Sequence, residues 1–192
     1  MSCPFCNRES MMTSAPFDGV KQPCNRWIYK SDHCYVVLKP EQHTIGESIV
    51  ILNDHKADLT DDIPIEKLSD FMNIIKIIST RTKNIAKNED SESPERIYVG
   101  ILCDGITTQH LHAHLIPRYP FSKYDESKYE EFFLKRDGEI EIIKKQKAKD
   151  LGGYWYVCDK EQNHYKSSYA QKAVKDRVRF LECLANELRL AP

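Results

Sequence analysis

Short runs of apolar residues, rich in β-branched and aromatic side chains, recur along the first two thirds of the chain, and polar or turn-forming segments separate them. Such runs are typical of β-strands. The polar segment 30–33 lies between the first two runs and predicts a hairpin. The stretches predicted as strands are 27–29, 34–38, 48–52, 97–103 and 109–118.

The hydrophobic period changes between the third and fourth of these strands. Over residues 64–87 apolar side chains recur at steps of three and four, which predicts a helix with one apolar face, and Pro64 suits its first turn. Residues 168–190 carry a second stripe of this kind, predicting a helix that docks on the core or on a second subunit. Residues 7–24 show little periodicity and are predicted to form an irregular knuckle and loop.

The composition indicates a nearly neutral protein that can bury one full core, since 41% of its 192 residues are hydrophobic. Lys and Arg number 28 against 29 Asp and Glu, so no polyanion such as duplex DNA is expected as the main partner. We expect a small substrate. No signal peptide and no apolar stretch of about 20 residues is apparent, which favours a cytoplasmic protein without a membrane partner.

The seven cysteines are an odd number, and five of them are scattered without a framework, which suits a reducing compartment. Cys3 and Cys6 are the exception, because they form a Cys-x-x-Cys pair. Such a pair is found in zinc half-sites and in redox motifs, and it also occurs by chance. Zinc is favoured here because no strand precedes the pair, as a thioredoxin-like motif would require.

Three histidines, His110, His112 and His114, alternate with apolar residues in the last predicted strand. Because side chains on a strand alternate between its faces, the three imidazoles are predicted to emerge on one face. They can be ordinary strand residues, a three-histidine metal site, or a nucleophile with neighbours that orient it and bind the group it attacks.

The histidine run ends in Leu115-Ile116-Pro117-Arg118, and as a whole it resembles the histidine triad (HIT) family of nucleotide hydrolases and transferases. In that family the middle histidine attacks the α-phosphate of a nucleotide and forms a covalent nucleotidyl-histidine intermediate. The resemblance implies that His112 is the nucleophile and that His114 binds the phosphoryl oxygens or the leaving group.

The same resemblance implies the fold. It predicts an α+β protein whose HIT-like core is an antiparallel sheet of about five strands with a covering helix, followed by a helical C-terminal extension. Residues 1–119 would form the catalytic domain with an N-terminal zinc knuckle, and residues 120–192 would pack on the core or on a dimer mate. Relatives commonly form dimers, so a homodimer is expected by analogy.

The chain also resembles the zinc-carrying, bacterial-type branch of the family. Residues 46–55 are similar to the strand that ends in a ligand histidine in those proteins, and that residue would be His55. The implied ligands are Cys3, Cys6, His55 and His110. Four protein ligands leave no open position for water, so the expected cofactor is one structural zinc ion per chain.

The segment before the triad is expected to contact the phosphate through Gly105, Thr107 and Gln109. Two positions depart from the family pattern. Many relatives have a glutamine after the glycine, whereas this chain has Ile106, so the contact to the leaving group is missing or is supplied by Gln109. Lys39 occupies the position where many relatives place an acidic residue for the ribose hydroxyls, so either Glu41 substitutes or the nucleoside is bound differently.

The implied function is hydrolysis at the α-phosphate of a dinucleoside polyphosphate or a nucleoside phosphoramidate. One alternative is a nucleotidyltransferase or phosphorylase whose acceptor is phosphate or a sugar phosphate. The other is a nucleotide-binding regulatory protein with little turnover.

Overall fold

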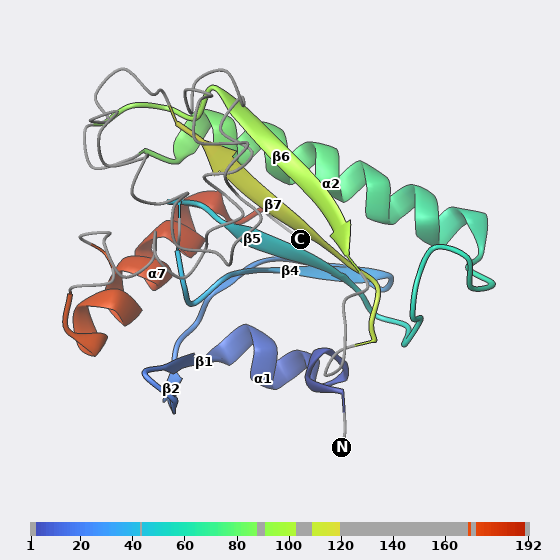
Figure 1. Cartoon of the computed structure of the whole chain (residues 1–192), viewed down its shortest axis with the longest axis horizontal. Coiled ribbons are helices and arrows are strands. Elements are labelled where there is room, and N and C mark those ends of the chain that lie inside the picture. The colour runs from blue at the N-terminus through green and yellow to red at the C-terminus, as the bar shows by residue number, and fades with distance from the viewer. Residues whose placement is uncertain are drawn as a thin grey trace, which may run out of the picture.

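The structure, a computed structural model, describes residues 3–42, 44–87, 91–102, 109–119, 169 and 172–190. Its centre is a five-stranded antiparallel sheet with the strand order β3-β4-β5-β7-β6 (Figure 1). Helices pack on this sheet, so the predicted α+β class is confirmed. The strands are β3 (Trp27–Lys30), β4 (Cys34–Leu38), β5 (Ser48–Leu52), β6 (Arg96–Leu102) and β7 (His112–Arg118).

The last strand begins later than predicted, at His112 instead of residue 109. The backbone just before this strand does not continue the regular pattern of hydrogen bonds between strands. The N–H of Leu111 donates to the carbonyl of Lys56 (2.7 Å), in the segment that follows β5. His110 therefore lies just outside the strand that carries the other two histidines.

One face of the sheet packs against α2 (Ile65–Ile85) and α7 (Val174–Leu188), which confirms both predicted helices. In Figure 1 α2 runs along the far side of β6 and β7. Burial of this apolar face supplies the main driving force for the arrangement. Its core includes Val36, Leu38, Val50, Leu52, Phe71, Ile74, Ile78, Ala113, Leu115, Leu181, Ala185 and Leu188.

The opposite face of the sheet is covered by the N-terminal segment. Side chains that alternate with the first set point into a second, smaller cluster, against which Phe5, Met11 and Trp27 pack. Because both faces are covered, β4 and β5 are buried at every position and read as continuous apolar runs. The buried members of this cluster are Met12, Tyr35, Val37, Ile49 and Ile51.

The prediction of an irregular loop over residues 7–24 was wrong. The segment forms α1 (Arg8–Thr13) and the hairpin of β1 (Ser14–Phe17) and β2 (Val20–Pro23), after a 3-10 turn, η1 (Pro4–Cys6). Asp18 and Gly19 have φ values of 51° and 78°, which suit the two central residues of a tight hairpin turn. Asp-Gly was thus an available hairpin signal, while α1 is too short to show a helical period.

The loop between β4 and β5 is held against α2 at Gly46. This glycine has a φ of 93°, and a Cβ atom there would lie 2.9 Å from Cγ2 of Thr82. A side chain would both strain the backbone and push the loop off the helix. Close approach at Gly46 therefore fixes where the chain enters β5.

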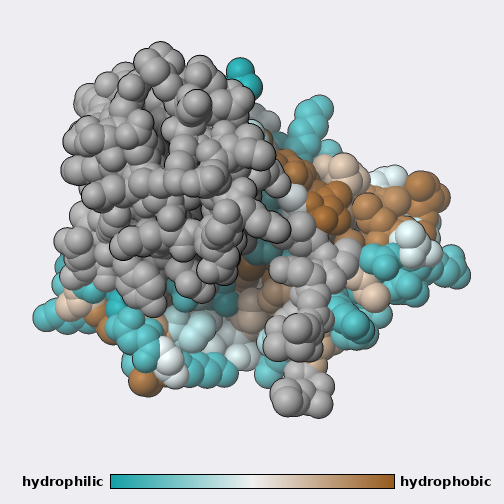
Figure 2. Space-filling view, in the orientation of Figure 1, coloured by the Kyte–Doolittle hydropathy of each residue, from teal (hydrophilic) through white to brown (hydrophobic). Residues whose placement is uncertain are grey.

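Apolar side chains gather on the surface at the right of Figure 2, where α2 and β6 lie in Figure 1. The exposed large apolar residues of these two elements are Ile65, Met72, Ile77 and Val99. Among the residues that the structure describes, no helix combines the length and the apolar character needed to span a membrane.

Candidate functional site

His112 and His114 lie on the sheet face that the N-terminal segment covers. Antiparallel pairing places His112 opposite Ile51 and His114 opposite Ile49, both of which belong to the smaller cluster. The two imidazoles are buried, with 3% and 8% of their surface exposed. The position of β7 between β5 and the edge strand β6 therefore holds two polar rings in the interior of the sheet.

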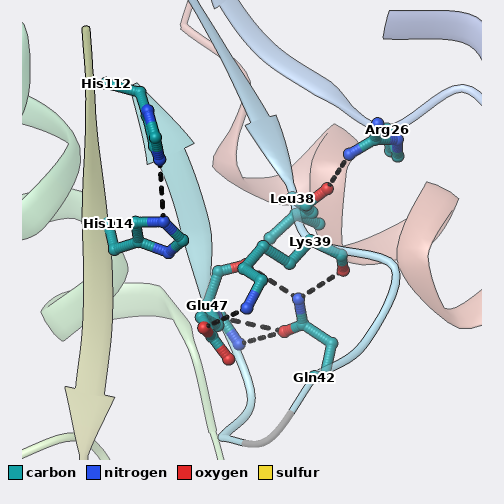
Figure 3. A network of polar contacts seen from close by, with 8 residues as sticks. Arg26, Leu38, Lys39, Gln42, Glu47, His112 and His114 are labelled. Atoms are coloured by element: carbon teal, nitrogen blue, oxygen red, sulfur yellow. Dashed lines mark hydrogen bonds and ion pairs between the residues drawn. The ribbon is translucent and has the colours of Figure 1, made fainter. Parts of the chain in front are cut away.

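The hydrogen bonds of His112 define its tautomer. Its Nδ1 lies 2.6 Å from the carbonyl oxygen of His110, and because a carbonyl can only accept, Nδ1 carries the proton. Nε2 then bears a lone pair. It lies 3.1 Å from Nε2 of His114, which must donate in this contact (Figure 3). A neutral imidazole nitrogen thus sits beside a hydrogen-bond donor, as nucleophilic attack on an anion requires.

His110 faces a different set of partners from the other two rings, so the expectation that all three emerge together from one strand needs correction. Its Nε2 donates to the carbonyl of Leu52 (2.7 Å), which leaves Nδ1 deprotonated. Burial lowers the pKa of His110 below the ordinary imidazole value, so the ring stays neutral. The nitrogen of His110 that bears the lone pair points toward two cysteine sulfurs.

Cys3, Cys6, His55 and His110 form a cluster that could hold a metal ion, and these are the four predicted ligands. Their ligand atoms all lie within 4.8 Å of one another. Sγ of Cys3 is 3.4 Å from Nδ1 of His110, and Sγ of Cys6 is 3.2 Å from Nδ1 of His55. A tetrahedral zinc site separates sulfur and nitrogen ligands by about 3.6 Å, so the donor set and its spacing fit a metal of this kind.

The four ligands come from three separate parts of the chain. Cys3 precedes the turn η1 and Cys6 is its last residue, and the N–H of Cys6 donates to the carbonyl of Cys3 (3.2 Å). His55 follows β5, and His110 precedes β7. Burial and the neighbouring Cys3 thiol raise the pKa of Cys6, whereas a bound cation would favour the thiolate. A metal would therefore tie the N-terminus to the ends of two central strands.

Phe5, which sequence reasoning missed, lies between the two cysteines and touches the histidines. Its ring centroid is 4.9 Å from that of His112 at 68° and 5.8 Å from that of His110 at 87°. Both are edge-on contacts, a preferred geometry for aromatic rings. The hydroxyl of Tyr35 donates to the carbonyl of Phe5 (2.7 Å) and anchors this residue to β4.

Lys39 and Glu47 form an ion pair on the same face of the sheet. Nζ of Lys39 lies 2.7 Å from Oε1 of Glu47, and their side chains are 13% and 1% exposed. Lys39 lies two residues after Val37, and Glu47 lies two residues before Ile49, the residue paired with Val37. The ion pair therefore continues the row of side chains on this face of the sheet, next to His114 (Figure 3). Glu41, the residue predicted as a possible substitute for the missing acid, is exposed.

Gln42, also missed from the sequence, fixes the backbone around this ion pair. Its side-chain amide donates to the carbonyls of Lys39 (2.7 Å) and Glu47 (2.8 Å), and its oxygen accepts from the N–H of Gly46 (2.7 Å). Gln42 is fully buried. The loop therefore presents the pair from a rigid frame. The sequence carried no signal for this role, because the burial of a glutamine in a loop is decided by the packing around it.

We predict that Glu47→Gln lowers the free energy of unfolding by about 3 kcal/mol, because the Lys39 ammonium loses its carboxylate in a mostly buried position. Chemical denaturation measures the change. The control is Glu41→Gln, the same substitution at an exposed residue of this loop, with an expected effect within about 0.5 kcal/mol. Equal stability of the two variants would show that the pair contributes nothing.

The predicted phosphate contacts are Gly105, Thr107 and Gln109. Gly105 and Thr107 lie outside the described residues, and Gln109 is exposed immediately before His110. Of the predicted catalytic and metal-binding residues, the structure brings His112 and His114 into contact and gathers all four metal ligands beside them.

No protein-family model matches the sequence, and a search of curated proteins finds no significant match. Among solved structures, the chain is similar to a HIT family protein from Bacillus anthracis (24% identity, 62% of this chain and 74% of that chain, TM-score 0.46). It is also similar to a zinc-bound histidine triad family protein from Mycobacterium smegmatis (19%, 98% and 96%, TM-score 0.49). At these levels of similarity the likeness assigns no activity to the chain.

Proposed function

We propose that this chain is a nucleotide hydrolase of the histidine triad type, acting at an α-phosphate through a nucleotidyl-histidine intermediate. The observation that carries the proposal is the hydrogen bond from Nδ1 of His112 to the His110 carbonyl, which leaves the Nε2 lone pair beside a donor on His114. The pattern of His110, His112 and His114 in the sequence also supports the proposal.

In the proposed reaction the phosphate displaces the contact between the two rings. Nε2 of His112 attacks phosphorus in line, a P–N bond forms, and the bond to the leaving group breaks. From a dinucleoside polyphosphate a nucleoside phosphate leaves as an anion with the bonding electrons, whereas the amine of a phosphoramidate leaves with these electrons and a proton from solvent. Nε2–H of His114 donates to a phosphoryl oxygen, where negative charge develops. Water then attacks phosphorus, the P–N electrons return to Nε2 of His112, and the proton that the water loses is released to solvent.

We further propose that Cys3, Cys6, His55 and His110 hold one structural zinc ion per chain. Soft thiolates with imidazoles are a common zinc donor set, and four protein ligands close the coordination sphere. When bound, the ion would cross-link the N-terminus to the strand ends. His110, as a ligand, would serve the reaction through its backbone carbonyl, which orients His112.

The direct test is mass spectrometry after incubation with a panel of dinucleoside polyphosphates and nucleoside phosphoramidates. We expect a nucleoside monophosphate adduct on His112. The reaction must be quenched without acid, because acid breaks a phosphoramide bond to histidine. The His112→Gly protein is the control and should carry no adduct. Substrate consumption with an adduct mapped to another residue would contradict the proposal.

The acceptor of the nucleotidyl group can be identified by comparing the products formed with and without inorganic phosphate. Water as the acceptor gives a nucleoside monophosphate under both conditions, whereas a phosphorylase gives a nucleoside diphosphate when phosphate is present. The homodimer expected by analogy stays a prediction, with the apolar surface over α2 and β6 as the face available for it.

A further inference from the structure

We propose that Phe5 is a positioning residue that holds the His112 ring for attack, and that metal binding at Cys3 and Cys6 keeps Phe5 in place. The inference rests on the proposed function and adds to it. It makes the metal cluster a determinant of the nucleophile's orientation, beyond its role in stability.

The first observation is how His112 is held. Its Nδ1 edge is tied to the His110 carbonyl, and its Nε2 meets His114. The contact with Phe5, at 4.9 Å and 68°, supports the ring from a further direction. Hydrogen bonds at two edges still allow the ring to tilt, and a neighbouring aromatic edge restricts that tilt. Small errors in the line of attack slow reactions markedly, so this restriction matters for turnover.

The second observation is what holds Phe5. It is one of the two residues between the cysteines, and its carbonyl accepts from the Tyr35 hydroxyl (2.7 Å), where Tyr35 is 1% exposed. None of the three residues of η1 is fully buried. A turn this short has little packing of its own, so its position depends on its anchors. The two sulfur ligands, Cys3 two residues before Phe5 and Cys6 directly after it, would be the strongest of them.

The third observation is that two residues, Phe5 and His110, connect the metal cluster to the nucleophile. Phe5 contacts both His110 and His112, while His110 contributes a ligand nitrogen to the cluster and its carbonyl to His112. The ligand set therefore fixes both supports of the His112 ring. Loss of the metal would loosen the support from Phe5 first. The His110 carbonyl is also held just before β7, because the N–H of the same peptide group, that of Leu111, donates to the Lys56 carbonyl.

The test uses the full chain loaded with zinc and compares Phe5→Leu with Met12→Leu. Both residues pack in the smaller cluster, but the aromatic contact to His112 comes from Phe5. We expect Phe5→Leu to lower kcat about 10- to 100-fold, with KM changed less than about threefold and zinc content unchanged. Met12→Leu should change kcat less than about threefold. Equal kcat values for Phe5→Leu and the wild type would overturn the proposal.

A second readout does not depend on turnover. Imidazole ¹⁵N signals report which nitrogen carries the proton, a property that the loss of a neighbouring ring current leaves unchanged. In the wild type we expect a fixed Nδ1–H signal for His112. We expect averaging of the two nitrogens in Phe5→Leu, and the same averaging when a chelator removes zinc from the wild type, with circular dichroism to verify that the sheet persists.

The two measurements separate this inference from the proposed function. If no nucleotide is turned over, the proposed function fails, and the ¹⁵N signals still decide whether Phe5 positions the ring. If turnover is found but the Nδ1–H signal stays fixed in Phe5→Leu, the positioning role is refuted while the function stands. A chelator that has no further effect on His112 in Phe5→Leu would support the proposed coupling through Phe5.

Discussion

Replacing His112 by glycine is expected to lower kcat by on the order of 10⁴-fold or more, since the variant has no atom to attack phosphorus. His112 is buried against Phe5 and His114, and we expect the pairing of β7 with β5 and β6 to keep the sheet folded without this side chain. Steady-state kinetics with the best substrate of the panel measures the loss, and circular dichroism measures the fold.

The comparison variant is His114→Gln, whose amide can still donate toward the position of Nε2. We expect a loss of about 10²-fold at most, because this residue stabilises charge without forming a bond to the substrate. A His112→Gly protein that turns over as fast as His114→Gln would exclude His112 as the nucleophile. The order of the two effects is thus more informative than either value alone.

Removal of the proposed zinc ion is expected to have the largest effect on stability. With the ligands drawn from the N-terminus, the end of β5 and the start of β7, loss of the ion frees three chain segments at once. Binding energies of structural zinc sites are on the order of 10 kcal/mol, so we expect the free energy of unfolding to fall by at least about 4 kcal/mol. Thermal and chemical denaturation with and without a chelator measure the change.

Cys6→Ser should reproduce this loss, and elemental analysis should show the zinc content falling well below the one ion per chain expected for the wild type. Cys183→Ser is the matched control, because Cys183 is an exposed thiol on α7 that belongs to no such cluster among the described residues. Equal stability of the Cys6→Ser and Cys183→Ser proteins would contradict a structural role for the metal.

The regular elements were accessible from the sequence because their signals are local. The apolar stripes of α2 and α7 and the runs of β4 and β5 reflect burial on one or both faces, and each appears where it was predicted. The elements missed, α1 and the β1–β2 hairpin, are short. Their evidence was a cap at Asn7, which accepts from the N–H of Ser10 (3.3 Å), and a two-residue turn.

The contacts around the candidate site were less accessible because they join distant residues. Lys39 was identified as a departure from the family pattern, yet its carboxylate partner is the buried Glu47 rather than Glu41. The pairing depends on the β4–β5 register and on the loop that Gln42 holds. Neither feature has a period or a motif that reveals it beforehand.

The amino-acid sequence by itself determined the strand that carries His112 and His114, their emergence on one side of it, and the Cys-x-x-Cys pair, whereas His55 and His110 entered the predicted ligand set through the family resemblance. Alternation along a strand and ligand chemistry are properties of nearby residues. Only the tertiary structure decided that Cys3 meets His110, 107 residues away, and that Phe5 meets His112. Those contacts arise because α1 and its turn cover the second face of the sheet, an arrangement set by the packing of the whole chain rather than by any local pattern.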